Sequence, residues 1–145
     1  MNNLTVGVPV YNCADRLKYF LPSLLSQVYP KKLIDLIFVD SESKDRTRSI
    51  LDHFKTQHGA LYKQVVIDSI PHVELANPTH TLYENCARAR NRIVELSPKQ
   101  NDVLFIDSDV TGPSDAIRNL VRYVRVHNAD GSEKCVGWVV QNLHQ

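Results

Sequence analysis

Short apolar runs alternate with amphipathic segments along the whole chain. The runs cover residues 4–10, 33–39, 61–70, 103–106 and 135–140, and they predict β-strands because they are short and bounded by turn-forming residues. The segments between them place apolar residues at helical spacing, as Leu17, Phe20, Leu21 and Leu24 show. Strands that alternate with helices are typical of a mostly parallel sheet covered by helices. The pattern therefore predicts an α/β, Rossmann-like fold.

Local signals set the expected ends of the helices. Asp15 is a candidate N-cap of the first helix, and Pro22 interrupts its apolar pattern, which predicts a kink or an early end. A later helix is expected over residues 81–96, with Leu82 on its buried side. An irregular loop over residues 71–79 is expected before it, because two prolines lie there.

Composition narrows the function classes. A chain of 145 residues is the size of one domain, so residues 1–145 are expected to form a single unit. The formal net charge of +1 argues against a dedicated nucleic-acid binder. No signal peptide and no apolar run of about 20 residues is present, which predicts a protein without a transmembrane segment. The three widely spaced cysteines favour reduced thiols and a cytoplasmic location, with peripheral membrane association as the alternative.

Acidic residues follow a predicted buried strand at Asp107-Ser108-Asp109. Two carboxylates this close offer a compact set of hard oxygen ligands, which suits Mg²⁺ or Mn²⁺ shared with a diphosphate. The alternative is a solvated acidic turn. In open α/β sheets, ligands bind beyond the carboxyl ends of the strands. We therefore expect the strand ends after Val10, Asp40 and Asp107 to meet at one edge, with Asp40 and Asp109 facing a common cleft.

Three further side chains are candidates for the same edge. Asp40 could accept a hydrogen bond from a nucleobase, or it could cap the next helix. Tyr11 could pack on the face of a base, or it could be a core aromatic residue. Arg90 could hold phosphates as a fixed fork, whereas Arg88 is more simply a solvent-exposed arginine.

These segments resemble those of family 2 glycosyltransferases of the GT-A fold. That family has an apolar strand leading into P-x-Y-N, a helix that ends S-x-x-x-Q and a V-D-x-x-S-x-D-x-T segment. Here they correspond to VGVPVYN at 6–12, a Leu-rich helix that ends at Ser26-Gln27 and IFVDSESKDRT at 37–47. Downstream, ARARN at 87–91 and LFIDSDV at 104–110 match the A-R-N and DXD segments, and that part is also similar to Anp1-like mannosyltransferases.

The resemblance implies a donor site for a nucleotide-diphosphate sugar. Asp40 would contact the nucleobase, and Pro9 and Tyr11 would line its pocket. Arg90 would lie near the nucleotide or the diphosphate. Glu42 departs from the small residue usual in the family and leaves the nucleotide open.

The resemblance also implies a metal cofactor, Mn²⁺ or Mg²⁺. Asp109 would bind the metal and through it the diphosphate, and Asp107 would reach the ribose or the metal. The acceptor, which could be a glycan, a lipid or a protein, is not implied. Members of the family usually continue into an acceptor-binding part with the catalytic base, so residues 1–145 are expected to be the nucleotide-sugar-binding part. A partner or a further domain is expected to pack on the C-terminal strand at 135–140.

Two other interpretations stay open. Asp107-Ser108-Asp109-Val110-Thr111 fits the D-x-D-x-T signature of haloacid-dehalogenase-like phosphatases, in which the first Asp is the nucleophile. That signature normally opens its domain, whereas about a hundred residues precede it here. The chain could also be a non-catalytic nucleotide-binding or interaction module that kept the fold.

Overall fold

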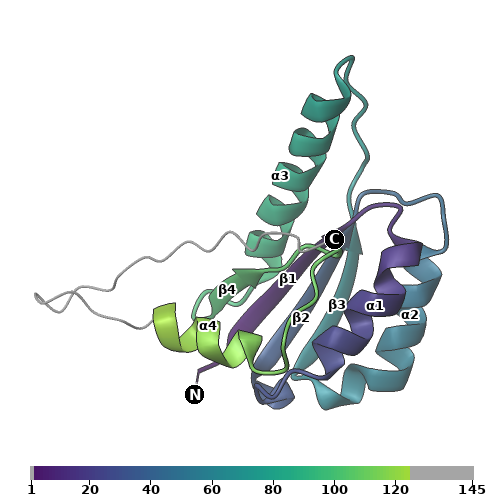
Figure 1. The fold of residues 1–145 in the computed structure, drawn as a ribbon. Coiled ribbons are helices and arrows are strands. Elements are labelled where there is room, and N and C mark those ends of the chain that lie inside the picture. The colour runs from purple at the N-terminus through teal and green to yellow at the C-terminus, as the bar shows by residue number, and fades with distance from the viewer. Residues whose placement is uncertain (1, 125–145) are drawn as a thin grey trace, which may run out of the picture.

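A four-stranded parallel sheet forms the centre of the molecule (Figure 1). The computed structural model describes residues 2–124, so the strand expected at 135–140 and the packing expected on it lie outside the described residues. The strands are β1 (Leu4–Val10), β2 (Ile34–Asp40), β3 (Gln64–Ser69) and β4 (Asp102–Phe105). Their order is β3-β2-β1-β4, and all three neighbouring pairs are parallel. This arrangement confirms the predicted α/β fold.

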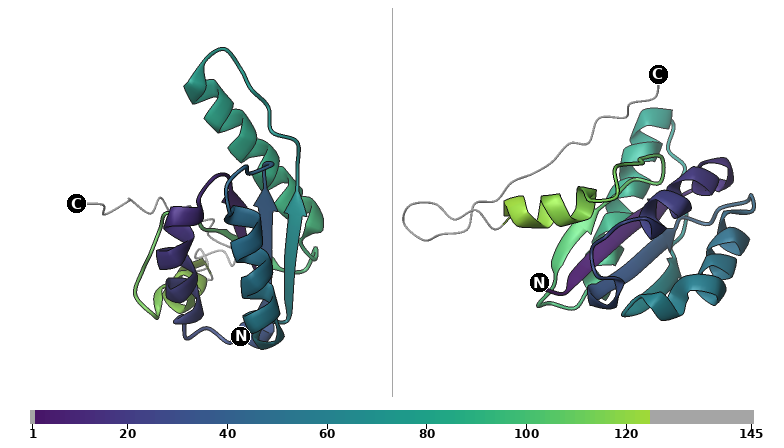
Figure 2. Two further views of the ribbon diagram at one scale, coloured as in Figure 1. Left: turned by 90° about the vertical axis from the view of Figure 1, so that its right-hand side faces the viewer. Right: turned by 60° about the horizontal axis from the view of Figure 1, so that its bottom comes forward.

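Helices cover both faces of the sheet (Figure 2). Helices α1 (Ala14–Leu25), α2 (Thr47–His58) and α4 (Ala116–Val124) lie on one face, and α3 (Pro78–Leu96) lies on the other. Two short 3₁₀ turns, η1 (Lys31–Leu33) and η2 (Gly59–Leu61), precede β2 and β3. None of the helices within residues 2–124 is long and apolar enough to cross a membrane.

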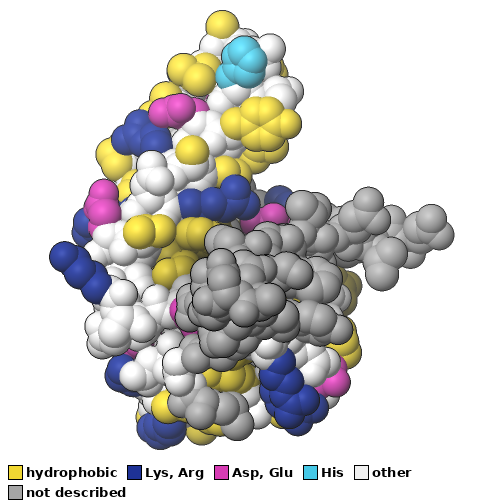
Figure 3. All heavy atoms as spheres, turned by 90° about the vertical axis from the view of Figure 1, so that its left-hand side faces the viewer, with side chains coloured by type: hydrophobic (Ala, Val, Ile, Leu, Met, Phe, Trp, Pro, Cys, Tyr) yellow, Lys and Arg dark blue, Asp and Glu magenta, His cyan; other side chains and the backbone are white. Residues whose placement is uncertain are grey.

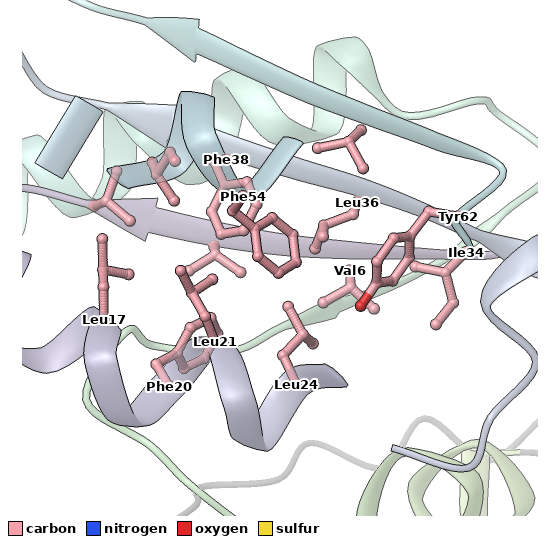
Figure 4. Close-up of a cluster of buried hydrophobic side chains, with 14 of the residues drawn as sticks. Val6, Leu17, Phe20, Leu21, Leu24, Ile34, Leu36, Phe38, Phe54 and Tyr62 are labelled. Carbon is pink, nitrogen blue, oxygen red and sulfur yellow. The ribbon is translucent and has the colours of Figure 1, made fainter. Parts of the chain in front are cut away.

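The main core lies between the sheet and helices α1, α2 and α4 (Figure 4). Every residue of β2 is buried, as is expected of a strand with neighbours on both sides and helices on both faces. On the opposite face, Ile37 and Val39 pack against Ala89 and Ile93 of α3. Gly7 permits this close approach, because a Cβ atom there would lie 2.5 Å from Cγ2 of Ile93.

Strand β4 is not buried as its apolar sequence predicted. Val103 is 37% exposed and Phe105 is 38% exposed. Among the described residues β4 pairs only with β1, so it forms an edge of the sheet and lacks a neighbour on its other side. The prediction of a buried strand was wrong because burial depends on those neighbours, which apolar composition does not reveal.

Helix α3 begins earlier than predicted and projects beyond the sheet. It starts at Pro78, and the Asn77 side chain caps it by accepting hydrogen bonds from the amides of Thr79 and His80. Its N-terminal half extends past the carboxyl edge of the strands (Figures 1 and 2), and hydrophobic side chains lie on the surface of this projecting part (Figure 3). Leu82 is therefore 59% exposed, and its predicted burial was wrong.

Helix α1 also departs from its expected ends. Cys13 occupies the N-cap position and Asp15 lies in the first turn, so the cap expected at Asp15 was wrong. The helix continues past Pro22 to Leu25 rather than ending early. Pro22 is exposed, so its ring is not forced against the packed side of the helix.

Candidate functional site

The carboxyl ends of β1, β2 and β4 meet at one edge of the sheet, as expected. Val10 lies opposite Asp40 in the register of β1 and β2. On the other side of β1, Gly7 lies opposite Phe105, and the amide of Ile106 donates to the Gly7 carbonyl at 3.0 Å. Asp107 follows directly and therefore leaves the sheet at the same edge.

Asp40 shapes the turn that follows β2. Its side chain is buried, and its Oδ1 accepts hydrogen bonds from the amide of Ser43 at 3.0 Å and from the Ser43 hydroxyl at 2.5 Å. A carboxylate held in this way fixes the loop after the strand. The proposed contact with a nucleobase stays a prediction.

The loops after β1 and β2 are tied together by side chains. Asn12 has a positive φ of 44°, its amide donates to the Ser43 hydroxyl at 2.9 Å, and its Oδ1 accepts from the Lys44 amide at 2.8 Å. Asn is one of the few residues that tolerate this left-handed conformation. The asparagine of the P-x-Y-N segment is therefore needed for the shape of the site.

Asp45 links the starts of two helices. Its Oδ2 accepts from the Ala14 amide of α1 at 3.1 Å, and its Oδ1 accepts from the Thr47 amide of α2 at 2.9 Å. Burial raises the pKa of Asp45, but the hydrogen bonds from Thr47 and Ala14 outweigh it, so the pKa lies below its ordinary value. The carboxylate thus stays charged where the free amides of a helix start favour an anion.

Tyr11 stacks on His72, which the sequence did not single out. The ring centroids lie 4.2 Å apart with an interplanar angle of 12°, and Tyr11 is 37% exposed, so it is not a core residue. The His72 amide donates to Oε1 of Glu42 at 2.7 Å, and the His72 ring Nε2 lies 2.9 Å from Oε1 of Glu74. One face of the Tyr11 ring is therefore covered by the loop that follows β3.

Asn85 anchors that loop to α3. Its Nδ2 donates to the Val73 carbonyl at 2.8 Å, and its Oδ1 accepts from the Val73 amide at 2.9 Å, as a paired strand would. Thr81 adds a second tie by accepting from the Leu75 amide at 2.9 Å. The loop beside Tyr11 is thus held in place although its sequence contains no motif.

Each acid of the DXD segment lies beside an arginine. Nη2 of Arg90 is 3.1 Å from Oδ1 of Asp107, and its guanidinium lies over the Phe105 ring at 5.9 Å. Nη1 of Arg16 is 3.9 Å from Oδ2 of Asp109. The structure therefore brings Arg90 to Asp107, and it adds Arg16, which no sequence pattern indicated.

The two carboxylates suit a divalent metal that is shared with phosphate. Within residues 2–124 no group of three or more His, Cys, Asp or Glu side chains could hold a metal ion. Mg²⁺ and similar ions are commonly held by one or two carboxylates together with phosphate oxygens and water. The donor chemistry of Asp107 and Asp109 fits such a shared ion, and the metal site itself stays a prediction. A hollow lies beside Asp109, between α1 and residues 108–112, and Asp40 is not among the residues that line it. A cleft common to Asp40 and Asp109 therefore stays a prediction.

The segment after the DXD acids is clamped to α1 by Ser23 and Gln27, the S-x-x-x-Q pattern. The Gly112 amide donates to the Ser23 hydroxyl at 3.2 Å. Nε2 of buried Gln27 donates to the Pro113 carbonyl at 2.9 Å, and its Oε1 accepts from the Ile117 amide at 3.1 Å. The family pattern thus has a physical role, which is to fix the chain directly behind the acids.

The described cysteines are ordinary free thiols. Burial raises the pKa of Cys13 and the pKa of Cys86, so both favour the protonated form. Neither thiol has the lowered pKa of a catalytic nucleophile. Cys135 lies outside the described residues.

Comparisons with known proteins agree on one family. The family model described as glycosyl transferase family 2 matches residues 5–133. A poly(ribitol-phosphate) beta-glucosyltransferase of Bacillus spizizenii is 28% identical over 127 residues, which are 88% of this chain and 18% of the relative. Glycosyltransferase AglE of Haloferax volcanii is 36% identical over 58 residues, which are 40% of this chain and 19% of the relative. The chain thus spans less than a fifth of the length of either relative.

Solved structures share the fold. The structure of S. aureus TarS 1-349 in complex with UDP-GlcNAc has a TM-score of 0.64 and 21% identity, and the match covers 84% of this chain and 31% of TarS 1-349. Mannosyltransferase PcManGT from Pyrobaculum calidifontis, in complex with GDP-Man and Mn²⁺, has a TM-score of 0.61 and 25% identity, with 84% and 32% covered.

Proposed function

Because the chain belongs to glycosyl transferase family 2, we propose that it forms the donor site of an enzyme that transfers a sugar from a nucleotide-diphosphate sugar to an acceptor. The observation that carries the proposal is the meeting of three elements at one sheet edge: the Tyr11 ring, the Asp107–Arg90 pair and Asp109. The family assignment favours this interpretation over the phosphatase one.

The base and ribose would lie over the ends of β1 and β2. Tyr11 would pack on the base and Pro9 would line the pocket, because Pro9 lies near the carboxyl end of β1 and Tyr11, which follows that strand, is partly exposed. Asp40 would accept a hydrogen bond from the base through the carboxylate oxygen that does not bind Ser43. The buried position of Asp40 would make that contact specific, since an unmatched polar group there is costly.

The diphosphate would lie between the DXD segment and α3. Asp109 would hold Mn²⁺ or Mg²⁺, with Asp107 reaching the metal or the ribose. When bound, the metal would offset the negative charge that builds up on the leaving diphosphate. Arg90 would exchange its half-exposed pairing with Asp107 for a phosphate, because a guanidinium can bind phosphate through two donors at once.

Structural relatives support this class of donor. TarS is solved with UDP and with UDP-GlcNAc, and PcManGT with GDP-Man and Mn²⁺. We propose that residues 1–145 act as the donor-binding part of the enzyme and that the catalytic base of the transfer comes from another part of it. This agrees with the small share of each relative that the chain matches.

The test is calorimetric titration of the chain with UDP, GDP and their sugar derivatives, with and without Mn²⁺. Binding of a nucleoside diphosphate that strengthens in Mn²⁺ supports the proposal, and the matching nucleoside monophosphate, which lacks the second phosphate, is the control. No binding of any of these nucleotides in Mn²⁺ would contradict it. Hydrolysis of p-nitrophenyl phosphate by the purified chain would favour the phosphatase interpretation instead.

A further inference from the structure

A hollow of about 750 Å³ lies between α1 and residues 108–112, the segment that contains the second DXD acid. This volume falls within the range of small-ligand sites in proteins, roughly 300–1,000 Å³. From α1 it is lined by Arg16, Lys18 and Tyr19, among others, and from the facing segment by Ser108 and Asp109. The α1 side of this hollow contains none of the proposed donor-binding residues.

The hollow adjoins the proposed site of transfer, because Asp109 lines it. A transferase must bring the acceptor hydroxyl close to the sugar carbon that leaves the diphosphate. If Asp109 holds the diphosphate through a metal, a chain lying in the hollow would end beside the reacting sugar. The hollow is therefore well placed for an acceptor.

Its lining combines apolar surface with positive charge. The Tyr19 ring is 65% exposed, and Pro22 supplies further apolar surface on the same helix. Nζ of Lys18 lies 5.1 Å from the Tyr19 ring centroid, and the Arg16 side chain is about half exposed. Among the described residues that line the hollow, Asp109 is the single acid, and Arg16 lies beside it. Rings present apolar faces to sugars and polyols, whereas the two cations favour an anionic chain.

The two walls of the hollow are fixed relative to each other. The Ser23 hydroxyl bonds the Gly112 amide at 3.2 Å, and Nε2 of Gln27 bonds the Pro113 carbonyl at 2.9 Å. Because these bonds join α1 to the facing segment, the hollow exists before any ligand binds. A preformed site loses less entropy on binding than one that must be assembled.

We propose that this hollow binds the acceptor, and that the acceptor is an anionic polyhydroxyl chain, such as a polymer of sugar phosphates or polyol phosphates. The proposal rests on the proposed function, since it names the acceptor of that transfer. Lys18 and Arg16 would contact the phosphates, and Tyr19 would pack on the carbon skeleton between them. A neutral chain would offer the exposed Arg16 and Lys18 side chains no phosphate to contact, and Arg16 would keep only its pairing with Asp109.

The test measures binding of a short poly(glycerol phosphate) to the chain in Mn²⁺ and saturating nucleoside diphosphate, with maltohexaose as the neutral comparison. We expect the phosphate polymer to bind and maltohexaose to bind at least about fivefold more weakly. Lys18→Glu should weaken binding of the polymer about fivefold or more, because it replaces an attraction by a repulsion at the surface. Lys55→Glu makes the same charge change at an exposed position of α2 outside the hollow and should have little effect.

The outcomes separate the two proposals. If the nucleoside diphosphate binds in Mn²⁺ but the polymer does not, the acceptor proposal is overturned and the donor function stands. The same holds if Lys55→Glu weakens binding of the polymer as much as Lys18→Glu does. Equal binding of maltohexaose and the phosphate polymer would overturn the proposal that the acceptor is anionic. Binding of the polymer by a chain that binds no nucleotide would overturn the donor function and leave only an anion-binding hollow.

Discussion

Replacing Gln27 by leucine should destabilise the protein and loosen the segment behind the DXD acids. Gln27 lies at the end of α1 and is buried, and its two side-chain atoms bond residues about ninety positions away. Its Oε1 accepts from the amide of Ile117, in the first turn of α4, where a helix offers amides without intrahelical partners. Gln27, which lies just after α1, thus caps α4 from outside that helix.

The magnitude follows from these contacts. Leu is similar in size, so little packing is lost, but the Ile117 amide loses its partner. The Pro113 carbonyl loses one of its two hydrogen bonds and keeps the one from the Ala116 amide at 3.0 Å. One buried unsatisfied group costs about 1–3 kcal/mol. We expect a loss of about 2.5 kcal/mol in the free energy of unfolding. For 145 residues the unfolding entropy is about 0.3 kcal/mol/K, so Tm should fall by about 8 °C.

Thermal unfolding followed by circular dichroism measures this change, and Gln57→Leu, an exposed position on α2, is the matched control. The Gln27 variant should also lose part of its Mn²⁺-dependent nucleotide binding at a temperature where it remains folded, since Asp109 precedes the clamped segment. A Tm within about 2 °C of wild type would refute the reasoning that Gln27 holds α4 and the segment before it.

Three further substitutions test other parts of the account. Tyr62→Phe should leave stability at pH 7 unchanged or raise it by about 1 kcal/mol, because the buried Tyr62 hydroxyl has no hydrogen-bond partner among the described residues. Burial raises the pKa of Tyr62 to about 12, so the native state holds the phenol proton more tightly than the unfolded state does. The wild-type protein should therefore lose stability between pH 10 and 12 in urea titrations, and the Tyr62→Phe variant should not. Gly7→Ala should lower the free energy of unfolding, measured by urea titration, by about 1–3 kcal/mol, because the new Cβ would collide with Ile93. An unchanged urea midpoint would contradict that packing. Tyr11→Ala should weaken nucleoside diphosphate binding about fivefold or more by calorimetry, and equal affinity would remove Tyr11 from the base pocket.

Some of the fold follows directly from local sequence. The apolar runs of β1 and β2 identify buried parallel strands because each of these strands has neighbours on both sides. The run of β4 has the same composition but lies at an edge of the described sheet, and only the three-dimensional arrangement reveals this. The predicted burial of Leu82 was wrong for a related reason, because helical spacing does not show how far α3 extends beyond the sheet.

Some residues of the candidate site could likewise be predicted from local sequence, and others could be found only in the structure. Asp107, Asp109 and Arg90 are recognisable from their motifs, and the structure brings Arg90 to Asp107. His72 and Arg16 could not be found in this way, because each is defined by a contact with a residue far away in the sequence. No spacing rule connects such pairs before the strands are placed side by side.

The most direct test of the central claim compares Asp109→Asn with wild type by calorimetric titration of a nucleoside diphosphate, with and without Mn²⁺. The claim is that Asp109 holds a metal through which the chain binds the diphosphate of a sugar donor. Loss of one charged ligand should weaken binding in Mn²⁺ at least about tenfold and leave metal-free binding nearly unchanged. Asp52→Asn, an exposed carboxylate of α2, should match wild type in both conditions. Equal affinity of wild type and Asp109→Asn in Mn²⁺ would contradict the account.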